Sequence, residues 1–259
     1  MERGASLRFP RRSPKVGPLK ISIVIPAFNE ERLLGQTLAH INSVRPVFAA
    51  AGWESELIVC DNNSTDRTAE IAEAAGATVV QEPVNQIARA RNTGAMAGSG
   101  EWLLFIDADS HPSGELFREV VEQIQVGRCL AGGSTVRLEA GYPVGSFVTG
   151  LWNGLSRWRR WLAGSFIFCE TAAFRKIGGF SNELFAGEEL DLSQRLHALA
   201  QEMNRTIVIL HRHPLHTSAR KMRLYSAREH LWFILRVALR PGGAIRSRES
   251  CNIWYDGRR

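Results

Sequence analysis

Residues 19–30 read LKISIVIPAFNE, an apolar, β-branched run that ends at Pro26 and passes into a polar turn. A short continuous apolar run of this kind is typical of a strand buried on both faces of a parallel sheet. Leucine and isoleucine then recur at helical spacing up to residue 41, and Asn29 is a suitable N-cap for that helix. The stretch therefore predicts a strand–loop–helix unit.

The unit recurs along the first half of the chain. Strands are predicted at 56–61, 77–81 and 101–106, with helices at 68–75 and 87–97. The second half is less regular, with strands predicted at 130–138, 164–169 and 206–210 and helices at 142–162, near 187 onward and 224–239. Alternating strands and helices predict one α/β domain with a mostly parallel central sheet and helices on both faces.

The chain of 259 residues carries a formal net charge of +6, much of it near the two ends. Solvated basic ends explain this charge, and an anionic ligand or a membrane surface is the alternative. Four widely spaced cysteines, Cys60, Cys129, Cys169 and Cys251, form no Cys-x-x-Cys pair, which favours buried reduced thiols. The sequence shows neither a signal peptide nor a run of about 20 apolar residues, so we expect a cytoplasmic protein, soluble or peripheral at the inner face of a membrane.

Polar residues follow three of the predicted strands, at 26–30, 61–66 and 107–109. In open parallel sheets, ligands bind beyond the carboxyl ends of the strands. The three loops are therefore expected to converge at one edge of the sheet and to form one site.

Asp107 and Asp109 stand on a tight turn directly after an apolar strand. Two carboxylates placed in this way suit Mg²⁺ or Mn²⁺, which accept oxygen ligands and leave room for phosphate and water. An isolated Asp-x-Asp is also found in solvated acidic turns, so the interpretation depends on the other two loops. Asp61 is expected to bind a base or ribose, or alternatively to cap its own turn.

The helix at 87–97 carries Arg89 and Arg91, which diverge because they stand two residues apart. We expect Arg91 to face a diphosphate, with a surface salt bridge as the alternative role. Arg89 takes its place if the helix is rotated.

Four motifs in this order, IVIPAFNE (23–30), DNNSTD (61–66), ARNTG (90–94) and FIDAD (105–109), resemble family 2 glycosyltransferases. The resemblance covers about residues 19–196. It implies a GT-A fold, a nucleotide-sugar donor, a divalent cation and, usually, inversion at the anomeric carbon. The expected organisation is a basic leader at 1–18, a GT-A domain at 19–240 and a basic tail at 241–259. Within the domain, residues 19–110 form the donor half and 111–240 the acceptor half.

The resemblance also implies roles for individual residues. Asp109 is the principal metal ligand, and Asp107 serves the ribose and the metal. The remaining donor-binding candidates are Pro26, Ala27, Asn29, Glu30, Asp61, Arg91, Ala108, Gly164, Glu188 and Arg220.

The chain departs from the family pattern at Glu188 and Glu189, where the family reads Glu-Asp. The base aspartate is then replaced by Glu189, which is one methylene longer. A carboxylate is favourable at a helix N-terminus and is able to take the proton of an attacking hydroxyl. Asp191 is the second candidate base, and helix-end charges without chemistry are the alternative for all three residues.

Two further clusters have less specific patterns. His213 or His216 is a candidate to complete the metal shell through a neutral imidazole, and Arg220 and Lys221 are candidates to clamp phosphate; ordinary surface residues are the alternative. Tryptophans and arginines at 152–161 suit contact with an acceptor or a lipid, or core packing with arginine heads reaching water.

The sequence therefore predicts a cation-dependent, inverting glycosyltransferase that moves a sugar to a hydroxyl acceptor, with a UDP-sugar favoured over GDP-mannose. The rivals are a non-catalytic nucleotide-sugar-binding protein and a sugar nucleotidyltransferase. The nucleotidyltransferase would need a Gly-rich loop after the first strand, where this chain has PAFNE. Nucleic acid is not expected as a partner, because no recognition motif accompanies the basic charge.

Overall fold

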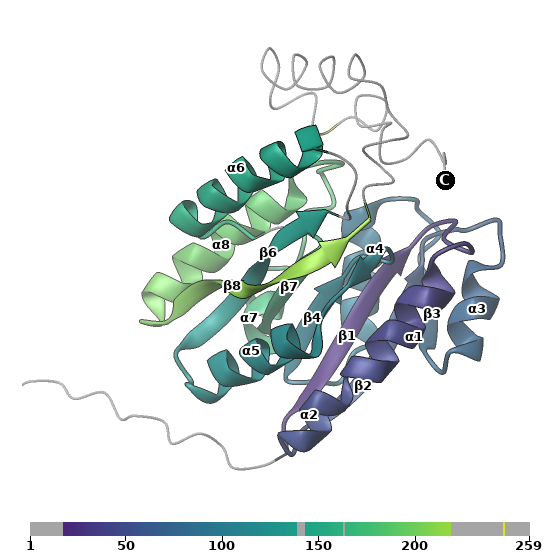
Figure 1. Ribbon diagram of the computed structural model, residues 1–259, viewed down its shortest axis with the longest axis horizontal. Helices are drawn as coiled ribbons and strands as arrows, with labels where there is room; N and C mark the ends of the chain where they lie inside the picture. The colour runs from purple at the N-terminus through teal and green to yellow at the C-terminus, as the bar shows by residue number, and fades with distance from the viewer. Residues whose placement is uncertain (1–17, 139–142, 163, 219–245, 247–259) are drawn as a thin grey trace, which may run out of the picture.

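The computed structural model describes residues 18–138, 143–162, 164–218 and 246 (Figure 1). The predicted leader and tail, the predicted helix at 224–239, Arg220, Lys221 and Cys251 lie outside these ranges, apart from residues 18 and 246. The division of the domain into a donor half and an acceptor half stays a prediction.

The strands are β1 (Lys20–Ala27), β2 (Glu54–Asp61), β3 (Thr78–Gln81), β4 (Trp102–Ile106), β5 (Ser110–His111), β6 (Cys129–Leu138), β7 (Phe166–Glu170) and β8 (Thr206–Thr217). The helices are α1 (Leu34–Val44), α2 (Pro46–Ala50), α3 (Thr68–Ala74), α4 (Ile87–Ala97), α5 (Gly114–Gln125), α6 (Pro143–Arg159), α7 (Thr171–Lys176) and α8 (Glu188–Glu202).

One eight-stranded sheet, in the order β3-β2-β1-β4-β7-β6-β8-β5, runs through the described residues. β1 pairs in parallel with β2 and β4, β2 with β3, and β6 with β8. β7 lies antiparallel between β4 and β6, and β5 pairs antiparallel with the end of β8. The predicted α/β domain with a mostly parallel sheet is confirmed.

Helices cover both faces of the sheet, because neighbouring side chains of a strand point to opposite sides (Figure 1). Ile23 packs into the core formed with α1, α2 and α5, whereas Val24 packs into the core formed with α4, α7 and α8. α4 lies so close to β1 that a Cβ on Gly94 would come within 2.5 Å of the Val24 Cγ1. The glycine of the ARNTG motif therefore sets how closely α4, which carries Arg91, approaches the sheet.

The structure corrects two local predictions. Asn29 is not the N-cap of α1, which begins at Leu34; it adopts a left-handed φ of 51° and accepts a hydrogen bond from the Thr65 N–H at 2.8 Å. Its short polar side chain tolerates this backbone and ties the first loop to the second. The last strand does not end at Leu210, since β8 continues to Thr217 by pairing with β6 and β5.

Cys60, Cys129 and Cys169 are buried free thiols, as predicted. Burial raises the pKa of Cys60 and of Cys129 to about 12, so both thiols are protonated at neutral pH. Among the described residues, no helix is both long enough and apolar enough to cross a bilayer.

Candidate active site

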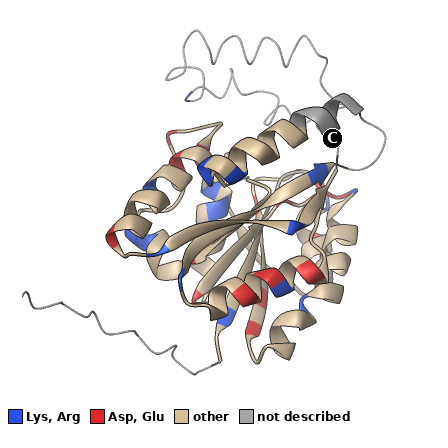
Figure 2. Ribbon diagram, turned by 60° about the vertical axis from the view of Figure 1, so that its left-hand side comes forward, with Lys and Arg blue, Asp and Glu red and all other residues tan. Residues whose placement is uncertain are grey.

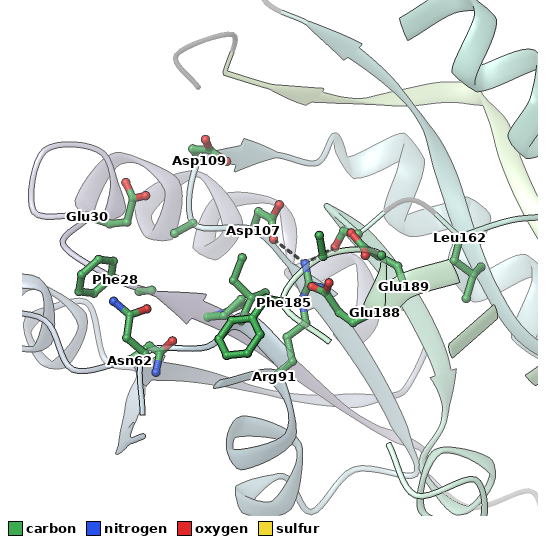
Figure 3. Close-up of a pocket in the computed structure, with 18 of the residues that line it drawn as sticks. Phe28, Glu30, Asn62, Arg91, Asp107, Asp109, Leu162, Phe185, Glu188 and Glu189 are labelled. Atoms are coloured by element: carbon green, nitrogen blue, oxygen red, sulfur yellow. Dashed lines mark hydrogen bonds and ion pairs between the residues drawn. The ribbon is translucent and has the colours of Figure 1, made fainter. Parts of the chain in front are cut away.

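A pocket of about 480 Å³ opens at the edge of the sheet where β1, β2 and β4 end (Figure 3). This volume lies in the range usual for small-molecule sites. Figure 3 shows Phe28, Glu30 and Asn62 on one side and Leu162, Glu188 and Glu189 on the other, with Asp107 and Arg91 between them. The pocket therefore joins two halves of the chain that are far apart in sequence.

Asp107 and Asp109 both line the pocket, on the short turn between β4 and β5. Asp109 is buried, and its carbonyl accepts a hydrogen bond from the Ser218 N–H at 3.2 Å. The Asp107 N–H donates to the Ser165 carbonyl at 3.3 Å. The turn is thus held from both sides by the second half of the chain.

The two carboxylates fit a divalent cation of the kind that binds phosphates. Within residues 18–138, 143–162 and 164–218, no group of three or more His, Cys, Asp or Glu side chains is arranged to hold a metal ion. Magnesium is commonly held by one or two carboxylates together with substrate phosphates and water, and manganese accepts similar oxygen ligands. The donor set of Asp107 and Asp109 matches that mode of binding.

The first loop lines the pocket through Pro26, Ala27 and Glu30, as predicted, and also through Phe28. Asn29 and Asp61 are not among the lining residues. The Asp61 Oδ1 accepts a hydrogen bond from the Ser64 N–H at 3.1 Å, which is the turn-capping contact considered as an alternative. A direct contact of either residue with the nucleotide stays a prediction.

Arg91 lies at the centre of the site and is only 3% exposed. Its Nη1 donates to the Glu188 Oε1 at 3.1 Å, and its Nη2 donates to the Asp107 Oδ1 at 3.2 Å and to the Gly164 carbonyl at 3.0 Å. Burial lowers the pKa of Arg91, but the charges of Asp107 and Glu188 outweigh it and hold that pKa above its ordinary value. Arg91 joins Asp107 to Glu188 of α8, and its expected contact with a diphosphate stays a prediction. Arg89, the fallback, donates its Nε to the Gln86 Oε1 at 3.1 Å.

α8 begins at the pocket after Gly187, whose φ of 74° turns the chain into the helix. Glu188 is buried, and burial together with the neighbouring charge of Glu189 raises its pKa to about 8, against the pull of Arg91. Glu189 lines the pocket beside Gly164, on the side of the pocket opposite Phe28 and Glu30 (Figure 3). The structure thus places two carboxyl groups of different environment at the helix start.

Three other candidates lie away from the pocket lining. Asp191 forms an ion pair with Arg195 at 2.5 Å, one turn further along α8. The His213 Nδ1 lies 2.5 Å from the Glu119 Oε1 of α5, whose acidic face Figure 2 shows in red. His216 is exposed on β8, opposite His111 of β5.

The sequence reasoning missed several pocket residues, among them Phe28, Asn62, Asn85, Leu162, Phe185 and Leu190. The sequence does contain a signal for Asn62: it directly follows Asp61 at the end of a predicted strand, where binding residues are expected. Its Nδ2 donates to the Glu82 and Val84 carbonyls at 3.1 and 2.7 Å, so it fixes the loop that leads to α4. Phe185 offered no signal, since only folding brings the turn before α8 to the pocket.

The family model described as "Glycosyl transferase family 2" matches residues 22–176. This match spans more than half of the chain and includes all four motifs. The chain belongs to glycosyl transferase family 2, and its fold is of the GT-A type.

An uncharacterised glycosyltransferase of Mycobacterium tuberculosis is 38% identical over 103 residues, which cover 39% of this chain and 43% of that protein. The chain therefore matches less than half of that relative's length. TarS of S. aureus, solved in complex with UDP-GlcNAc, is similar with a TM-score of 0.62 and 20% identity, over 85% of this chain and 65% of that one.

The mannosyltransferase PcManGT of Pyrobaculum calidifontis, solved with GDP-Man and Mn²⁺, is similar with a TM-score of 0.63 and 17% identity, over 93% of this chain and 69% of that one. At these identities the two structures support the fold.

Proposed function

We propose that this protein transfers a sugar from a nucleoside diphosphate donor, a UDP-sugar before GDP-mannose, to a hydroxyl group of an acceptor. One observation carries the proposal: Asp107, Asp109 and Glu189 line a single pocket, and Arg91 bridges its two sides. The UDP-GlcNAc and the GDP-Man with Mn²⁺ named for two similar structures support a donor of this class.

The donor nucleotide lies along Pro26–Glu30 and Asn62, and its diphosphate lies at Asp107 and Asp109. A divalent cation bound there would neutralise the negative charge that grows on the leaving diphosphate. Asp107 is held in place by Arg91, so its carboxylate is already oriented before a donor binds.

Glu189 takes the proton of the acceptor hydroxyl. The acceptor oxygen forms a bond to the anomeric carbon as the bond from that carbon to the diphosphate oxygen breaks, and the nucleoside diphosphate leaves with the electron pair. Attack from the side opposite the leaving group inverts the anomeric carbon. Trp152, Leu162 and Leu190 line the acceptor side and help to exclude water.

The role of Glu189 is tested by Glu189→Gln, which keeps the size of the side chain and removes its basicity. Release of nucleoside diphosphate from UDP-glucose, UDP-N-acetylglucosamine or GDP-mannose with Mn²⁺ is measured with water as acceptor. We expect kcat to fall at least about 100-fold while the donor KM stays within about twofold. Turnover equal to that of the wild type would remove Glu189 as the base, and donor binding without turnover in the wild type would favour the non-catalytic rival.

We also propose that α6 contacts an anionic lipid surface, which would present a lipid-linked acceptor to the pocket. On α6, large apolar side chains face solvent while polar side chains face the protein. Leu151 and Trp158 are 63% and 73% exposed. Asn153 instead bonds to the Val136 backbone, and Ser156 bonds to the Trp161 carbonyl. Trp152, on the same helix, lines the pocket.

Positive charge accompanies this apolar face. Arg157, Arg159 and Arg160 are exposed, and the Arg159 Cζ lies 4.5 Å from the centre of the Trp158 ring. An apolar face with tryptophan and arginine complements a membrane interface with anionic lipids, and core packing does not account for side chains this exposed.

A further inference from the structure

We propose that Gly164 is a positioning residue: the absence of a side chain there allows Glu189 to hold its carboxylate in the pocket. The inference rests on the proposed role of Glu189 as the base. It gives Gly164 a task different from the donor binding predicted from the sequence.

The space at Gly164 is filled by Glu189. A Cβ built on Gly164 would lie 2.3 Å from the Glu189 Oε1, 2.9 Å from its Cγ and 3.0 Å from its Cδ. Contacts this short do not persist in folded proteins, so one of the two residues has to move. Any side chain at position 164 therefore competes with the observed position of the Glu189 carboxylate.

The backbone at Gly164 is the less mobile partner. Its carbonyl accepts a hydrogen bond from the Arg91 Nη2 at 3.0 Å, and the next carbonyl, of Ser165, accepts from the Asp107 N–H at 3.3 Å. Moving this segment would leave a buried guanidinium without one of its partners, which is costly. The side chain of Glu189 has rotatable bonds and moves instead.

The pair also accounts for the length of the base in this chain. Glu189 stands where the family pattern has the shorter aspartate, and the extra methylene is accommodated over a residue without a Cβ. An aspartate at position 189 is one bond shorter and has no atom at the place of the Glu189 Oε1, which makes the shortest contact, 2.3 Å from the added Cβ. A methyl group at 164 is therefore better tolerated beside an aspartate than beside a glutamate.

The test compares four variants: Gly164→Ala, Glu189→Asp, the double variant of these two, and Glu189→Gln. For each variant, release of nucleoside diphosphate is measured with the donors and Mn²⁺ named above, and the donor Kd is measured by calorimetry. We expect Gly164→Ala to lower kcat about 100-fold with donor KM and Kd unchanged within about twofold, because a displacement near 1 Å is enough for such a loss. The double variant is expected to be about tenfold faster than Gly164→Ala alone. Gly35→Ala in α1 is the control, since its Cβ would meet only the Ile71 Cγ2, at an ordinary 3.5 Å.

The outcomes separate this inference from the function on which it rests. If Glu189→Gln is inactive while Gly164→Ala retains nearly full turnover, the positioning role is wrong and the base stands. If the double variant is no faster than Gly164→Ala, the loss comes from the backbone or from packing, and the positioning role is also wrong. If Glu189→Gln is fully active, both proposals fail together.

Discussion

At the scale of single residues, the site depends on how buried charges share their partners. Arg91 faces Asp107 and Glu188, while Glu188 also faces Glu189. Burial and the charge of Glu189 raise the pKa of Glu188 to about 8, so Glu188 is largely protonated at neutral pH. A neutral Glu188 leaves Asp107 as the charged partner of Arg91 and removes the repulsion between Glu188 and Glu189.

The raised pKa of Glu188 makes the stability of the protein depend on pH. Because the folded-state pKa of Glu188 lies above its ordinary value of 4.5, the folded state binds the extra proton. The contribution of this proton to the free energy of unfolding is fully present below about pH 4.5, and it is lost as the pH rises through about 8. Glu188→Gln is neutral throughout and keeps an oxygen to accept from Arg91.

We therefore expect the free energy of unfolding of the wild type to fall between pH 5 and pH 8 by roughly 1–4 kcal/mol more than that of Glu188→Gln. Urea unfolding of both proteins at the two pH values measures it, with Glu73→Gln on the exposed face of α3 as the control. Parallel pH dependence of the wild type and Glu188→Gln would contradict the account.

At the scale of elements, the regular first half was predictable and the second half was less so. α4 agrees with its predicted range of 87–97, because a strong helical pattern follows a clear turn. The N-cap of α1 is Leu33, four residues later than the predicted Asn29, since Asn29 bonds to the second loop rather than to its own helix. β8 continued through His211–Thr217 because its neighbours β6 and β5 supply partners that no local pattern reveals.

The residues of the site also divide into those that the sequence predicted and those that only the folded structure reveals. Strand-end loops predicted Pro26, Glu30, Asp107 and Asp109 at one pocket, and the family resemblance added Glu189. Nothing local predicted that Arg91 would be buried between two carboxylates, or that Glu189 would lie over Gly164. Those contacts join residues that are 97 and 25 positions apart in the chain, and only tertiary packing creates them.

The face of α6 gives the prediction at this scale. Leu151→Ser with Trp158→Ser is expected to lower sedimentation with phosphatidylcholine–phosphatidylglycerol vesicles at least about tenfold, because two large apolar side chains no longer enter the interface. Met96→Ser with Val126→Ser, at side chains 83% and 62% exposed elsewhere, is the matched control.

Binding by the wild type should also weaken in pure phosphatidylcholine, since the arginines then lack anionic partners. Unchanged vesicle binding by the α6 variant would contradict the proposal. A marked drop in its melting temperature would also contradict it, because that result would mean that the face packs against the chain itself.

At the scale of the whole molecule, one sheet brings loops from both halves of the chain to a single edge. The parallel strands β1, β2 and β4 supply the loops of the first side of the pocket. Gly164, which precedes β7, and the start of α8 line the second. Arg91 connects the two sides of the pocket, so Asp107, Gly164 and Glu188 are held by one buried network.

The most direct measurement of the central claim is calorimetric binding of UDP-glucose, UDP-N-acetylglucosamine and GDP-mannose to the wild type and to Asp109→Asn, with Mn²⁺ or with EDTA. The account predicts that the wild type binds at least one of these donors at least about tenfold more tightly with Mn²⁺, and that Asp109→Asn loses this difference. Absence of binding to all three donors, or equal affinity of both proteins with Mn²⁺ and with EDTA, would contradict the assignment of this pocket as a cation-dependent donor site.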